Sequence, residues 1–75
     1  MHMDFVEAME RLKRAVTDDE IAAATGVSTN TIRRTRADPA TRNYRPAPHG
    51  WRIVLAELAG KRAAELLALK QELER

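Results

Sequence analysis

The sequence predicts an all-α fold, a small helical domain of about four helices with a long C-terminal helix. Apolar residues recur at intervals of three and four near both ends of the chain, which is the spacing of one helical face. Residues that favour helix N-caps, Asp4, Thr17 and Ser28, precede three segments. All three prolines fall within residues 37–50, so the rest of the chain is free to be helical. A length of 75 residues indicates a single domain, 1–75.

The first helix is expected from Asp4 to about Val16. Asp4 and Glu7 stand three residues apart, the spacing of a capping box. The apolar residues of this segment fall on one face: Phe5, Met9, Leu12 and Val16. We expect this face to pack into the core.

A second, short helix is expected from Asp18 to about Thr25. Thr17 would be its N-cap, and Glu20 stands at the position that completes a second capping box. Gly26 follows, and glycine just past a helix end adopts the left-handed conformation that stops a helix at little cost.

A third helix is expected from Thr29 to about Arg36, with Ser28 as its N-cap. Ile32 is its only strongly apolar residue. A helix that buries so little apolar surface is either marginally stable or exposed because its side chains serve a function other than packing. The loop that follows, residues 37–50, is long for so small a chain, and loops of this length are often functional.

The last helix is expected from about His49 to Leu73, with Trp51 in the core. At 1.5 Å per residue it is about 35 Å long, more than three short helices can cover. We expect its distal half to form a homodimer interface, with these candidates: Leu58, Ala63, Leu66, Leu67, Leu69 and Leu73. Alternatively, the chain is a monomer whose last helix folds back or frays beyond Gly60, since a glycine within a helix costs about 1 kcal/mol.

Positive charge is concentrated in the middle of the chain. Residues 1–27 hold three basic and six acidic side chains, residues 28–52 hold six arginines and one aspartate, and residues 53–75 hold four of each sign. The balances of −3, +5 and 0 give the net charge of +2. A basic middle is typical of nucleic-acid-binding proteins, and arginine suits bidentate contacts with phosphate and guanine. A solvated basic loop would give the same pattern.

Residues 17–36 resemble the helix-turn-helix of the Cro/C1 type, found in phage and plasmid repressors. The matching residues are Ile21, Ala22, Gly26, Val27 and Ile32. In such a motif the small residue lets the helices approach, the glycine permits the turn, and the apolar residues fix the interhelical angle. The resemblance extends loosely through "RPAPHGW" and covers Thr17 to Leu58. Thr25 and Thr35 depart from it, because such motifs usually place a larger apolar residue there.

The resemblance implies two sets of DNA contacts. A recognition helix in the major groove would contact base edges through Ser28, Thr29, Asn30, Arg33 and Arg34. Phosphate contacts would come from Thr17, Thr31, Arg36, Arg42, Tyr44 and Arg45. Each set has a plainer interpretation, as solvated polar residues of a helix and a loop. For Tyr44, packing of the loop over the core is the favoured one.

No arrangement of residues indicates catalysis, so we expect a protein that is not an enzyme. The acidic run Asp18, Asp19 and Glu20 could suggest a metal site, but at a helix N-terminus it is better explained by the helix dipole. We expect no cofactor, no metal and no small-molecule ligand. No apolar stretch is long enough to cross a bilayer, and the N-terminal segment carries charge throughout, so we expect a cytoplasmic protein.

The leading hypothesis is a sequence-specific regulator of transcription that binds double-stranded DNA, acting as a repressor in a bacterium or phage. As a homodimer it would present two recognition helices about 34 Å apart to successive major grooves. The rival hypothesis is a protein–protein interaction module, such as an antitoxin or a polymerase-binding adaptor. In that case Trp51 to Leu73 would bind another protein and the basic middle would be surface only.

Overall fold

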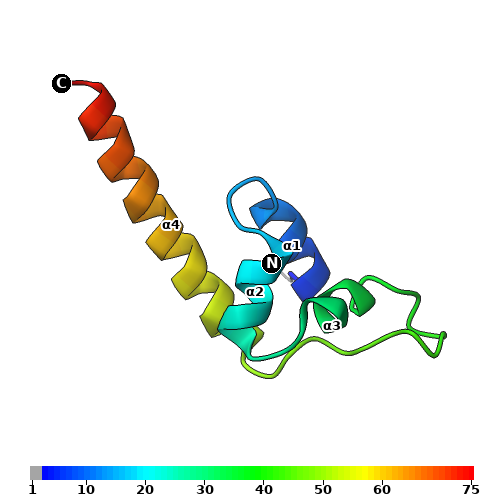
Figure 1. Ribbon diagram of the computed structural model, residues 1–75. Helices are drawn as coiled ribbons and strands as arrows, with labels where there is room; N and C mark the ends of the chain where they lie inside the picture. The colour runs from blue at the N-terminus through cyan, green and yellow to red at the C-terminus, as the bar shows by residue number, and fades with distance from the viewer. Residues whose placement is uncertain (1–2) are drawn as a thin grey trace.

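The computed structural model describes residues 3–75, and residues 1–2 of the predicted domain lie outside it. The described chain is all-helical, as predicted, and contains no strand. Its helices are α1 (Phe5–Leu12), α2 (Asp18–Thr25), α3 (Thr29–Arg34) and α4 (Trp51–Leu73). Figure 1 shows the three short helices gathered around the first turns of α4, and we call this part, residues 3–62, the head. The rest of α4 extends away from it.

The core lies inside the head and takes residues from all four helices. Its buried members are Phe5, Ala8, Met9, Val16, Ile21, Ala22, Ile32 and Leu55. Trp51 closes one side, with its ring edge-on to Phe5 at a centroid distance of 5.4 Å, a favourable aromatic geometry. The predicted core position of Trp51 is therefore confirmed, although its side chain stays partly exposed.

Side-chain caps fix where the helices begin. The Asp4 carboxylate accepts a hydrogen bond from the backbone N–H of the third residue of α1, at 2.8 Å. Thr17 and Glu20 form the predicted capping box at α2. Ser28 caps α3 as predicted. Each cap satisfies N–H groups that a helix cannot satisfy within itself.

The predicted end of the first helix was wrong. Helix α1 stops at Leu12, and a turn follows in which the N–H groups of Ala15 and Val16 both bond to the Leu12 carbonyl, each at 2.8 Å. Val16 still reaches the core and is 3% exposed, but it does so from a bend. Helix α4 contributes to this geometry, because Arg62 donates to the Ala15 carbonyl at 2.6 Å.

Two other boundaries differ from the prediction. Helix α3 ends at Arg34, and Thr35 is buried with its hydroxyl donating to the Ile32 carbonyl at 2.6 Å. Helix α4 begins at Trp51, because Gly50 has a φ of 72°, a left-handed conformation that a helix cannot include.

Helix α4 runs without interruption through Gly60, and it neither folds back nor frays there. Every residue from 63 to 75 is exposed. The radius of gyration is 14.3 Å, against about 11 Å for a compact domain of this length. The distal half of α4 therefore packs against nothing within its own chain.

Candidate nucleic-acid interface

Helices α2 and α3 are joined by a turn of three residues that holds them at a fixed angle. Gly26 adopts a left-handed conformation with a φ of 77°, and its N–H and that of Val27 both bond to the Ala22 carbonyl. Ile21 and Ile32 belong to the same core cluster and are almost completely buried. The residues that carry the resemblance therefore form the junction between the two helices.

The three acidic residues at the start of α2 each bind a different part of the molecule. Asp18 pairs with Arg36 beyond α3, at 3.0 Å. Asp19 accepts a hydrogen bond from the Thr29 hydroxyl at the start of α3, at 2.7 Å. Glu20 pairs with Arg62 of α4. The acidic run thus links α2 to its neighbours, and no group of acidic and histidine residues in the described chain could hold a metal ion.

Two of these contacts change the proton affinity of the groups involved. The hydrogen bond from the Thr17 backbone N–H lowers the pKa of Glu20, and the nearby Arg62 lowers it further. The hydrogen bonds to Asp18 raise the pKa of Arg36 above its usual range. Both groups are therefore held in their charged forms.

The base-contact candidates separate into two groups. The Ser28 hydroxyl caps α3 and bonds to the Thr31 hydroxyl at 2.9 Å, and the Thr29 hydroxyl is bound to Asp19. These polar groups already have partners in the fold.

The second group is Asn30, Arg33 and Arg34, which lie on one face of α3. They stand three and four residues apart, so their side chains share the outer face, opposite the buried Ile32. Asn30 and Arg33 are exposed and Arg34 is partly exposed. We call this set the α3 outer face. Among the described residues, no hydrogen bond or ion pair occupies these three side chains.

The phosphate-contact candidates also separate. The Arg36 guanidinium lies between Glu10, at 3.3 Å, and Asp18, and its side chain is 28% exposed. Thr17 is occupied by its capping box. The hydroxyl of Thr31 is bound to Ser28. In this conformation these three groups hold the fold together, and Arg36 in particular is not free to bind a phosphate.

The remaining candidates lie in the loop beside α3. The Arg45 N–H donates to the Arg34 carbonyl at 3.3 Å, which brings the loop close to the end of α3. Arg42 and Arg45 are exposed, and the Arg45 guanidinium donates to the carbonyls of Arg42 and Tyr44. The backbone of the loop therefore lies beside the end of α3 at Arg45, and both arginines of this loop are exposed.

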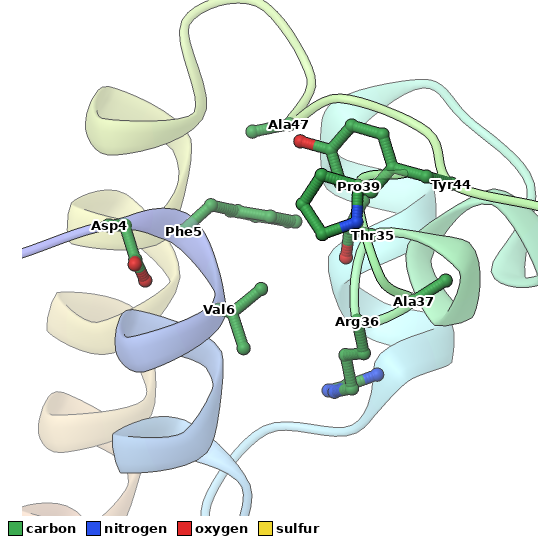
Figure 2. Close-up of a pocket in the computed structure, with 9 residues that line it drawn as sticks. All are labelled: Asp4, Phe5, Val6, Thr35, Arg36, Ala37, Pro39, Tyr44 and Ala47. Atoms are coloured by element: carbon green, nitrogen blue, oxygen red, sulfur yellow. The ribbon is translucent and has the colours of Figure 1, made fainter. Parts of the chain in front are cut away.

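Tyr44 is partly buried and lines a pocket together with residues of α1. Figure 2 shows the pocket with Tyr44 and Pro39 on the side of the loop and Phe5 pointing into it from α1. The pocket has a volume of about 300 Å³ and lies between α1 and the loop. Tyr44 therefore lies on the wall of this pocket, and its packing over the core stays a prediction.

The dimer candidates are exposed with one exception. Leu58 packs against the core, so the structure gives it a place within its own chain. Ala63, Leu66, Leu67, Leu69 and Leu73 are exposed. Sequence analysis missed Ile53, whose exposed fraction is 68%. The signal was its position on the side of α4 opposite Leu55.

Comparisons with protein-family models, with curated proteins and with solved structures found no match to this chain. Within residues 3–75, none of the helices combines the length and the apolar character that a membrane span requires.

Proposed function

We propose that this protein is a sequence-specific regulator of transcription that binds double-stranded DNA as a homodimer and acts as a repressor in the cytoplasm of a bacterial cell. The observation that carries the proposal is the α3 outer face. Asn30, Arg33 and Arg34 project together from a short helix, and no hydrogen bond or ion pair with another described residue occupies their side chains.

The chemistry of this face suits the edges of base pairs. Asparagine can pair bidentately with adenine and arginine with guanine in the major groove, and each good pair contributes about 1–3 kcal/mol of discrimination. Arg42 and Arg45 are exposed in the loop whose backbone bonds to the end of α3, and we expect them to contact the phosphate backbone. The caps and ion pairs of α2 hold α3 in place, which is what a rigid reading element requires.

The proposal is tested by removing the two positive charges of the α3 outer face and measuring the loss of DNA binding. Arg33→Ala combined with Arg34→Ala should weaken binding to the preferred duplex by at least about 100-fold, measured by fluorescence anisotropy. The matched control is Lys13→Ala combined with Arg14→Ala, which removes the same charge from an exposed turn distant in sequence. Equal effects of the two pairs would mean that only net charge matters, and the proposal would fail.

A second candidate function is supported by the exposed apolar residues of α4. Ile53, Leu66, Leu67, Leu69 and Leu73 have exposed fractions between 53% and 75%, and exposed apolar patches mark interaction sites. As an antitoxin or an adaptor for polymerase, the protein would bind its partner through α4. The Arg33 and Arg34 variant would then leave partner binding unchanged.

A further inference from the structure

One face of α4 carries a regular seam that the head leaves largely open. Its positions follow each other at alternating intervals of four and three residues: Arg52, Ala56, Ala59, Ala63, Leu66, Lys70 and Leu73. This is the spacing of the a and d positions of a coiled coil. Ala59 is half-buried and the other six are exposed. We call this set the α4 seam.

The α4 seams of two copies are complementary in side-chain size only when the two helices run antiparallel. Past Arg52 its first half is made of alanines, and its second half is made of long side chains. When two copies align antiparallel, Leu73 of one lies opposite Ala56 of the other, Lys70 opposite Ala59, and Leu66 opposite Ala63. Each layer then pairs a small residue with a large one, which fills the space between the helices.

A parallel alignment gives the opposite result. Each alanine would face the same alanine, which leaves voids along half of the seam. Lys70 would face Lys70, and like charges at facing positions are unfavourable. The residue pattern therefore favours the antiparallel orientation.

A groove in the head continues the seam. It has a volume of about 240 Å³ and lies between α1 and α4, with Ala8 and Leu12 on one wall and Leu55, Ala56 and Ala59 on the other. These residues are apolar, and the groove lies at the height that Leu73 of an antiparallel copy reaches. A leucine that is 75% exposed in the single chain would be covered there.

The charges around the groove agree with this occupant. Arg11 and Arg52 line the groove and are exposed. Glu74 directly follows Leu73, so the antiparallel alignment brings its carboxylate to the same end of the head. The C-terminal end of a helix also carries partial negative charge, which cations stabilise.

The proposed DNA-binding face is not covered by this arrangement. Helix α3 packs on α2, whereas α4 packs on α1 and α2. Dimerisation and the α3 outer face therefore use different surfaces.

We infer that a second copy of this chain docks antiparallel along the α4 seam, with the two-fold axis between Ala64 and Glu65. Leu73 of each copy occupies the α1–α4 groove of the other. The inference deepens the homodimer of the proposed function, and it rests on that proposal for its link to DNA.

Disulfide cross-linking tests the orientation directly, because the chain contains no cysteine. Ala56→Cys and Leu73→Cys are prepared separately, mixed without DNA and oxidised. The expected product is the disulfide between the two different variants, since only facing positions bring Cα atoms within about 7 Å. Both positions are exposed, so the head stays folded, and circular dichroism checks this.

The matched control is Glu57→Cys mixed with Gln71→Cys. These positions lie within one residue of the same height in the antiparallel alignment but away from the seam, so they should not cross-link. Predominant linkage of Leu73→Cys to itself would show a parallel dimer and overturn the inference. Equal cross-linking of the control pair would also overturn it.

A second variant tests the interface without cysteine. Ala63→Glu places a charge at the centre of the seam and should weaken dimerisation about tenfold or more, measured by light scattering. A wild-type chain that is monomeric at high micromolar concentration would contradict the inference. Because DNA is absent from these measurements, failure of the dimer is distinguished from failure of DNA recognition.

Discussion

At the scale of single residues, the neighbours of each arginine decide its role. Arg33 has no partner among the described residues, Arg36 lies between two carboxylates, and Arg62 binds both Glu20 and the Ala15 carbonyl. The exposure of Arg33 could be predicted, because helical spacing places it opposite Ile32. The ion pairs of Arg36 and Arg62 could not, because their partners are distant in sequence and become neighbours only after folding.

Arg36 and Arg33 should therefore respond differently to the same substitution. Arg36→Ala should lower the free energy of unfolding by about 1 kcal/mol, since it removes a partly buried ion-pair network. Arg33→Ala should leave stability within about 0.5 kcal/mol, as exposed substitutions usually do. Urea denaturation measures both. A larger loss for Arg33→Ala would mean that α3 needs this residue to fold.

Glu20 should make the stability of the head depend on pH in the acidic range. Its pKa is lowered in the folded state, so the stability it contributes is present above the ordinary glutamate pKa of about 4.3 and is lost as pH falls below it. Thermal unfolding followed from pH 7 to pH 3 should show this loss. Glu20→Gln keeps the capping pattern without the charge, so its melting temperature should fall less steeply; parallel curves would contradict this role.

At the scale of elements, local signals predicted where helices begin better than where they end. The N-caps Asp4, Thr17 and Ser28 are all confirmed. They could be predicted because the cap side chain bonds to a backbone N–H only a few residues further along the chain. The predicted end of α1 near Val16 was wrong, since the turn at residues 13–16 includes the hydrogen bond from Arg62 and the burial of Val16. Tertiary contacts decide such boundaries.

The turn between α2 and α3 depends on Gly26. Its φ of 77° is costly for residues with a Cβ, so Gly26→Ala should destabilise the head by about 1–2 kcal/mol. Gly26→Asn serves as the control and should cost less, because asparagine tolerates this conformation better. Chemical denaturation of the three proteins checks the order. An alanine variant as stable as the wild type would show that the turn can rearrange.

At the scale of the whole molecule, the head contains the entire buried core and the distal half of α4 lies outside it. All buried core residues lie between Phe5 and Leu55, and residues 63–75 are exposed. The length of the last helix and its surplus of apolar residues could be predicted from the sequence. The groove beside α1 could not, because it requires the packing of two helices that are far apart in the chain.

Removal of residues 63–75 should therefore separate folding from assembly. The shortened chain, ending at Arg62, should keep the head within about 1 kcal/mol of its original stability, because it loses only exposed side chains. It should also be monomeric in light scattering. A shortened chain that does not fold would show that the distal half of α4 stabilises the head.

The central claim is that the α3 outer face reads a DNA sequence, and selection of binding sites from a random duplex library tests it most directly. The selected pool is then measured again at low and at physiological salt. We predict enrichment of an inverted repeat, with binding that weakens as salt rises from about 50 to 200 mM because counterions are released from phosphates. Binding without enrichment, or no binding at all, would contradict the claim.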